Sequence, residues 1–94
     1  MLKYNTMSVA KELNIQDKEL EKRSLKSFLE RELLALKTEF LILAFKYNLG
    51  SVSEFEKAVK KGKIRETEDT REDFFRLDYL ENRTGLIENL LNKI

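Results

Sequence analysis

The strongest constraint on the fold is the stretch Leu25–Tyr47, LKSFLERELLALKTEFLILAFKY, which no glycine or proline interrupts. Its apolar residues recur at steps of four and three, the spacing that places side chains on one face of an α-helix. The members of this stripe are Leu29, Leu33, Leu36, Phe40, Leu43 and Tyr47. From Phe40 to Phe45 the sequence FLILAF is apolar throughout, so this end of the helix is expected to be covered on more than one side. The run is far shorter than the roughly 20 residues that cross a bilayer, and no membrane span is expected.

The helical pattern extends over residues 17–48, with Asp17 as the expected N-cap and Gly50 as the expected left-handed residue after the helix. At 1.5 Å per residue this helix is about 45–50 Å long. A compact domain of this chain length is only about 30–35 Å across. The helix must therefore bend, the molecule must be elongated, or a second copy must cover what protrudes.

A short helix is expected over residues 52–61, because Ser51 and Glu54, and again Ser53 and Glu56, have the spacing of a capping box. Gly62 is expected to end this helix. Since Gly50 lies just before it, the chain is expected to reverse sharply here and to place the short helix near the FLILAF end.

A third major helix is expected over residues 70–93, with Thr70 at its cap. Its apolar stripe again follows steps of three and four. The stripe consists of Phe74, Leu77, Leu80, Ile87, Leu91 and Ile94. Gly85 lies inside this helix and is expected to mark a bend or a point where another backbone comes close.

These elements predict one all-α domain over residues 1–94, built as an antiparallel helical hairpin, with residues 1–16 as an arm or a short helix. Two long helices and a small one do not cover all of this apolar surface, so we expect a homodimer that forms a helical bundle. Phe75 and Tyr79 form either a second layer of the core or an exposed anchor pair. The expected dimer or partner face comprises Leu29, Leu33, Leu36, Phe40, Leu43, Tyr47, Phe75, Tyr79 and Leu91.

Composition argues against catalysis and against most ligands. The chain has no Cys and no His, which removes thiolate chemistry, the commonest general base and the commonest transition-metal ligand. Because no glycine-rich phosphate loop and no paired nucleophile and base are present, we expect no enzyme, no cofactor, no metal and no small-molecule substrate. A net charge of +1 gives no general attraction to nucleic acid or membranes. No signal-like apolar segment follows Met1, so a cytoplasmic location is expected.

Two charged clusters follow each other. Lys57, Lys60, Lys61, Lys63 and Arg65 are candidate phosphate contacts, but cations also favour the C-terminal end of a helix. Glu66, Glu68, Asp69, Glu72 and Asp73 could hold a divalent cation, but acidic residues also collect at helix N-termini. The segment SVAKELNIQDKELEKRSL has the outline of a helix-turn-helix, although the acidic residues of its second helix would face phosphates.

The segments RSLKSFLERELLALKTEF (Arg23–Phe40) and TREDFFRLDYLENR (Thr70–Arg83) resemble small uncharacterised helical proteins of hyperthermophilic archaea, some of them antitoxin-like. The resemblance implies a non-catalytic module that binds another protein, as an antitoxin or adaptor does. High Glu and Lys content without Cys fits the hyperthermophile bias. The alternative is a nucleic-acid-associated regulator that uses the Lys57–Arg65 cluster or the N-terminal segment.

Overall fold

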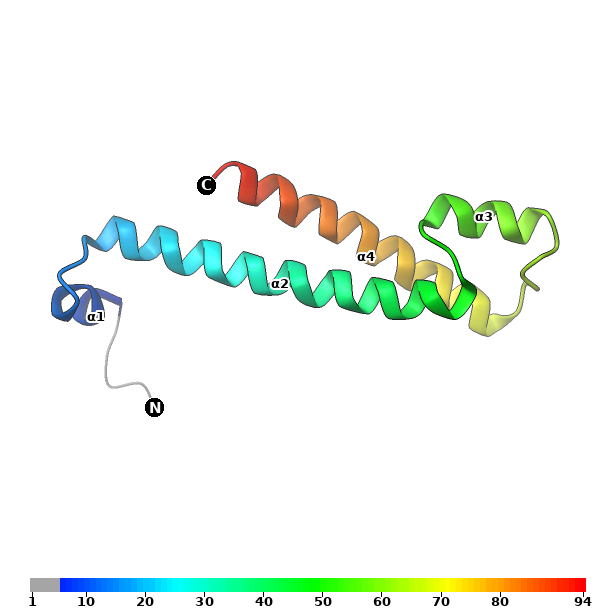
Figure 1. The fold of residues 1–94 in the computed structure, drawn as a ribbon, viewed down its shortest axis with the longest axis horizontal. Coiled ribbons are helices and arrows are strands. Elements are labelled where there is room, and N and C mark those ends of the chain that lie inside the picture. Colours follow the sequence, from blue (N-terminus) through cyan, green and yellow to red (C-terminus); the bar gives the residue numbers. More distant parts are fainter. Residues whose placement is uncertain (1–5) are drawn as a thin grey trace.

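The computed structural model describes residues 6–94, which form α1 (Thr6–Glu12), α2 (Asp17–Tyr47), α3 (Val52–Lys60) and α4 (Glu68–Asn92). No strand occurs in this part of the chain. In Figure 1, α4 runs back along α2 in the antiparallel direction, and α3 lies at the closed end of the hairpin. The predicted all-α class and the helical hairpin are therefore confirmed.

The molecule is elongated, measuring 60 × 30 × 16 Å with a radius of gyration of 19.3 Å. A compact chain of this length has a radius of gyration of about 12 Å. The first part of α2 extends beyond the C-terminal end of α4 and meets α1 there (Figure 1). Of the three outcomes expected for so long a helix, elongation is the one that the structure adopts.

The core lies at the closed end, where α2, α3 and α4 meet. Ala44, Val52, Phe55 and Leu77 are buried together there. The Phe55 ring is at the centre, 4.9 Å from the Tyr47 ring and 5.5 Å from the Phe74 ring between centroids. The apolar residues packed around this cluster are Phe40, Leu43, Tyr47, Leu49, Val59, Ile64 and Phe74. The short α3 therefore caps the hairpin with its apolar face, as the sequence predicts.

Polar contacts fasten α2 to α4 on the outside of this core. The carboxylate of Asp73 accepts hydrogen bonds from Tyr47 Oη and from Lys46 Nζ, the latter at 2.7 Å. Further along, Arg76 binds Glu39 with both ends of its guanidinium, and Nη2 lies 2.7 Å from Oε1. Because each carboxylate receives more than one donor, these contacts fix the register of the two long helices.

The ends of α2 differ from the sequence prediction. Asp17 is the first helical residue, and Gln16 is the N-cap residue, without a side-chain cap hydrogen bond. At the other end Asn48, not Gly50, takes the left-handed conformation, with φ 56°. Asparagine tolerates this conformation, and the Asn48 N–H donates to the Ala44 and Phe45 carbonyls, so α2 closes before Gly50 is reached.

The starts of α3 and α4 are also fixed by caps. Ser51 Oγ accepts from the Glu54 N–H at 3.2 Å, whereas the Glu54 carboxylate accepts from Gly50 rather than from Ser51. The second candidate box is not used, because α3 already begins at Val52. At α4 the N-cap is Thr67, not Thr70, and the two threonines exchange hydrogen bonds between hydroxyl and backbone N–H at 2.7 and 3.2 Å.

The remaining turn and glycine predictions have mixed outcomes. Gly62 follows α3 and takes φ 75°, which confirms it as the end of that helix. Gly85 does not interrupt α4, and nothing lies within 4 Å of where its Cβ would be. The close backbone approach expected at Gly85 is therefore absent within the described residues. The arm predicted over residues 1–16 contains α1, while residues 1–5 lie outside the described part.

Candidate protein-interaction surfaces

The predicted interface stripe of α2 lies on the side that packs within the chain. Leu29 is buried, and the other five members are half-buried. Phe40, Leu43 and Tyr47 pack against the core cluster, which includes Leu77 of α4. Leu91, on α4, is half-buried as well. The hairpin itself thus uses most of the apolar area that the sequence offers as an interface.

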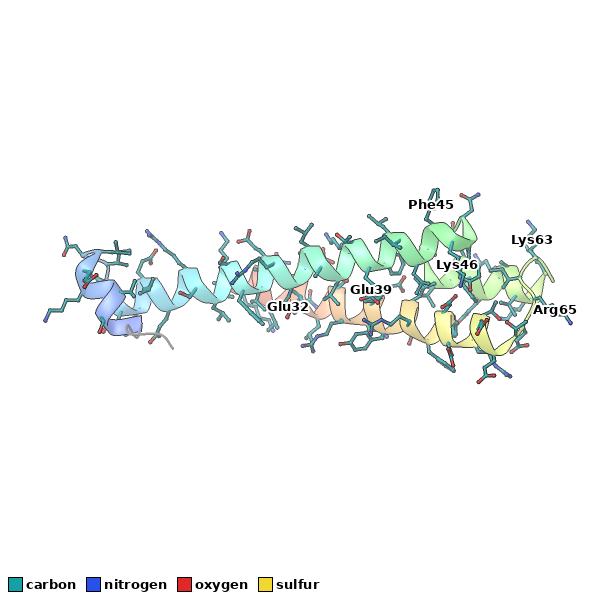
Figure 2. The ribbon with its side chains drawn as sticks, turned by 90° about the horizontal axis from the view of Figure 1, so that it is seen from below. Glu32, Glu39, Phe45, Lys46, Lys63 and Arg65 are labelled. Atoms are coloured by element: carbon teal, nitrogen blue, oxygen red, sulfur yellow. The ribbon has the colours of Figure 1, made fainter. Side chains whose placement is uncertain are left out.

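The opposite side of α2 carries a second apolar stripe, which we call the α2 outer stripe. It consists of Leu34 (67% exposed), Leu41 (67%), Ile42 (69%) and Phe45 (83%). In Figure 2, Phe45 points away from α4. Three of the four residues belong to the all-apolar run FLILAF, for which the sequence predicts cover on more than one side. Among the described residues, this second side is not covered.

A third apolar surface, which we call the α4 outer face, runs along the solvent side of α4. It consists of Phe75 (67% exposed), Tyr79 (50%), Leu86 (47%) and Leu90 (38%). A shallow hollow lies between Phe75, Tyr79 and Leu86, with Asp78, Asn82 and Arg83 completing its lining. Of the two alternatives for Phe75 and Tyr79, the exposed position is the one found.

The sequence interpretation missed six of these exposed residues as candidates: the four of the α2 outer stripe, together with Leu86 and Leu90 on α4. The signal was available. Leu34 and Leu41 are seven residues apart, as Thr38 and Phe45 are, which is a heptad pattern on a second face of α2. This heptad spacing is easily overlooked, because the same helix carries a more regular apolar stripe that packs within the chain.

The electrostatics next to the α4 outer face hold Tyr79 in place. The Arg76 guanidinium lies 5.1 Å from the centre of the Tyr79 ring. The hydrogen bond from Arg76 to Glu39 lowers the pKa of the Glu39 carboxyl, which favours the charged pair at neutral pH. The Tyr79 side chain is therefore already held by an ordered cation. It would lose less conformational entropy on binding a partner than a free side chain would.

At the closed end of the hairpin, Asp73 forms a clasp with Lys46 and Tyr47, in which burial and hydrogen bonding act on the pKa values in different directions. Desolvation by itself would raise the pKa of Asp73, but hydrogen bonds from Lys46 and Tyr47 and the Lys46 charge outweigh it and lower the pKa. Desolvation raises the pKa of Tyr47, and its hydrogen bond to Asp73 adds to this. Tyr47 therefore stays protonated and donates to an ionised Asp73, which is a structural rather than a reactive arrangement.

Two hollows open between the helices, one beside α3 and one between α2 and α4. One, of about 180 Å³, has an apolar floor of Phe55, Val59 and Phe74 and a rim that includes Lys60 and Arg71. The other, of about 310 Å³, continues along the groove between α2 and α4. It is lined by Lys37, Phe40, Leu41, Gly50, Glu81, Thr84, Gly85 and Glu88. Both hollows are open to solvent.

The basic cluster is exposed at the closed end of the hairpin. Lys57, Lys60, Lys61, Lys63 and Arg65 all have high solvent exposure. Figure 2 shows Lys63 and Arg65 at this extremity, beyond the long helices. None of the five forms an ion pair within residues 6–94. In the same range no group of three acidic side chains lies close enough to hold a metal ion, so the acidic cluster is spread out around the start of α4.

Comparison with known proteins identifies the family but adds no neighbour of known function. No helix among the described residues combines the length and apolar character that crossing a membrane requires. No curated protein and no solved structure gives a significant match. A family model does match, over residues 1–94. The chain therefore belongs to the family described as the Uncharacterized protein MJ0235 family.

Proposed function

We propose that this protein is a non-catalytic protein–protein interaction module, antitoxin- or adaptor-like, that self-associates and binds a second protein through the α4 outer face. The observation that carries the proposal is the exposure of Phe75 and Tyr79 next to each other on one helix. Exposed aromatic side chains are enriched at interfaces and often dominate their binding energy, and Tyr79 in addition lies against the Arg76 guanidinium.

The shape of the α4 outer face supports a helical or extended segment as the partner element. Phe75, Tyr79, Leu86 and Leu90 follow the helix axis in a line, so a partner that lies along α4 meets all four. Asp78 and Arg83 at the edge of the hollow carry opposite charges. Charges at a rim affect the choice of partner and the association rate more than the affinity.

The family membership and the composition support the wider setting of the proposal. A family model over the whole chain agrees with the resemblance to uncharacterised archaeal proteins. High charge content without Cys supports an origin in a hyperthermophile. We also propose a cytoplasmic location.

The test is capture from the native lysate with immobilised protein, as wild type, Phe75→Glu and Leu13→Glu. Leu13 is an exposed apolar residue after α1, so its variant matches the charge change at a distant place. We expect one protein to be retained by the wild type and Leu13→Glu and lost with Phe75→Glu. Retention that is equal on all three, or absent from the wild type, would contradict the proposal.

A nucleic-acid-associated regulator is the second candidate, because five exposed cations at one end of the molecule form no ion pair with any described residue. Phosphate binding by such a cluster would weaken by orders of magnitude between low and moderate salt. A gel shift of DNA and RNA at low salt, with Lys60→Glu/Lys63→Glu as the comparison, tests it. Absence of any shift by the wild type excludes this candidate.

A further inference from the structure

The α2 outer stripe has no covering within the described chain, and the chain as a whole exposes too much surface for its mass. Its accessible surface is 7750 Å², whereas a compact monomer of 11.1 kDa exposes about 5,700 Å². The excess of about 2,000 Å² exceeds the roughly 800 Å² that each partner buries in a standard interface. The molecule therefore has enough spare surface for a stable dimer.

The outer stripe has the pattern of a helix seam. Arg31, Thr38 and Phe45 follow seven-residue steps, and Leu34 and Leu41 follow a second line of such steps beside them. These are the a and d positions of a heptad repeat, through which two helices pack knobs into holes. A second α2 is the partner that presents the same spacing.

The stripe is self-complementary when the second copy runs antiparallel. Around a two-fold axis next to Thr38, Leu34 faces Phe45 of the second copy, and Thr38 faces Leu41 of the second copy. Each contact occurs twice, as a closed two-fold interface requires. On one side of the seam Ala35 then lies opposite Ile42 of the second copy, which matches a small side chain with a large one.

Charges on the flank of the seam do not oppose this arrangement. Glu32, Glu39 and Lys46 follow seven-residue steps along α2 (Figure 2). Within each chain Glu39 is paired with Arg76, and Lys46 is paired with Asp73. Because both partners lie on α4, Glu39 and Lys46 bring no unpaired charge to the seam.

A parallel arrangement is disfavoured by the seam itself. It would place Arg31 against Arg31 of the second copy at an a position, where like charges repel. In the antiparallel arrangement Arg31 faces the polar Asn48 of the second copy instead, at the exposed end of the helix.

We infer that a second copy of this chain docks on the α2 outer stripe, with the two α2 helices antiparallel and the two α4 helices on the outside. The α4 outer faces then point away from the seam and stay available to other proteins. This inference rests on the proposed interaction role, but the two fail separately, because lysate capture tests the α4 outer face and self-association tests α2.

Sedimentation velocity of the full chain tests the inference with three variants. Ile42→Glu changes the seam at an exposed position, and Leu41→Ser changes an exposed leucine that also lines the groove between α2 and α4. Leu25→Glu is the matched control, because Leu25 is an exposed leucine of the same helix outside the seam. Circular dichroism confirms that each variant is helical.

We expect the wild type and Leu25→Glu to sediment as dimers at tens of micromolar. Since the substitution acts twice in a two-fold interface, we expect Ile42→Glu to raise the dissociation constant at least about 100-fold, and Leu41→Ser to raise it less. A monomeric wild type would overturn the inference. So would a dimer that Ile42→Glu leaves as tight as the wild type, or a stable heterologous complex that seats another protein on this stripe.

Discussion

At the scale of single residues, Asp73 is the point at which the closed end of the hairpin is tied together. Its carboxylate takes donors from two consecutive residues of α2, Lys46 and Tyr47, and so fixes both the rotation and the register of that helix. Glu39 and Arg76 repeat this on the next turns. The register of α2 against α4 therefore depends on ionised carboxylates.

This dependence predicts a loss of stability in acid. The pKa of Asp73 lies below its ordinary value of 3.8, and that of Glu39 below its ordinary value of 4.5, so the unfolded chain binds more protons than the folded one in this range. The two carboxylates contribute fully to the free energy of unfolding when the pH lies above their ordinary pKa values. This contribution is lost as the pH falls through the lowered pKa values of the folded state. Chemical denaturation between pH 7 and pH 2 measures it. Asp73→Asn should flatten the decline below pH 4, and an unchanged pH profile in this variant would argue against the clasp.

Replacing Gly85 or Gly62 by alanine should change the stability of the protein in opposite directions. Nothing lies within 4 Å of a Cβ added at Gly85 in the middle of α4, so Gly85→Ala should stabilise the protein by about 1 kcal/mol. Gly62 has φ 75°, so Gly62→Ala should destabilise it by about 1 kcal/mol although space is available. Urea denaturation of both variants measures the two changes. Destabilisation by Gly85→Ala would mean that a second chain approaches α4 there, in conflict with the α2 seam.

At the scale of elements, the long helices were predictable and their ends were less so. The 3–4 spacing of leucines and aromatics places α2 and α4 within two residues of the observed bounds, because tertiary packing buries the same stripe that the pattern marks. Helix ends depend on single hydrogen bonds, for which neighbouring residues compete. Asn48 ends α2 two residues before Gly50, and Thr67 starts α4 three residues before Thr70, because each makes the cap hydrogen bonds first.

The caps of α3 give a prediction at this scale. Ser51 accepts the Glu54 N–H, whereas Ser53 lies inside the helix without such a role. Ser51→Ala should therefore cost about 1 kcal/mol of stability, and Ser53→Ala, its matched control, only a few tenths. Thermal or urea denaturation of the two variants compares them. Equal effects would show that the first turn of α3 is not capped as described.

The candidate interaction surfaces were only partly predictable from the sequence. Amphipathic spacing identifies the most periodic face of α2, and this face packs against the rest of the hairpin. The positions of α3 and α4 determine which residues of α2 remain exposed. These positions depend on the packing of Phe55 and Leu77 and on the turn at Asn48, not on the pattern of α2. Leu34, Ile42 and Phe45 are therefore recognisable as a surface only after the fold is known.

At the scale of the whole molecule, the elongated hairpin separates three surfaces in space. The closed end carries the core and the basic cluster, the α2 outer stripe lies on one side, and the α4 outer face lies on the other. An antiparallel pair through α2 makes a bundle with two α4 outer faces directed outward. The placement of these surfaces in the dimer thus depends on how two α2 helices meet.

The most direct measurement is the distance between spin labels attached at Ser24→Cys in the full-length protein, which has no other cysteine. Ser24 is exposed and lies on α2 far from the two-fold axis. With a rise of 1.5 Å per residue, the antiparallel dimer places the two labels about 45–50 Å apart. Pulsed dipolar spectroscopy should show a distance distribution centred there. A distribution in the range of about 10–20 Å, which is near the axial spacing of parallel helices, or the absence of any dipolar signal, would contradict the account.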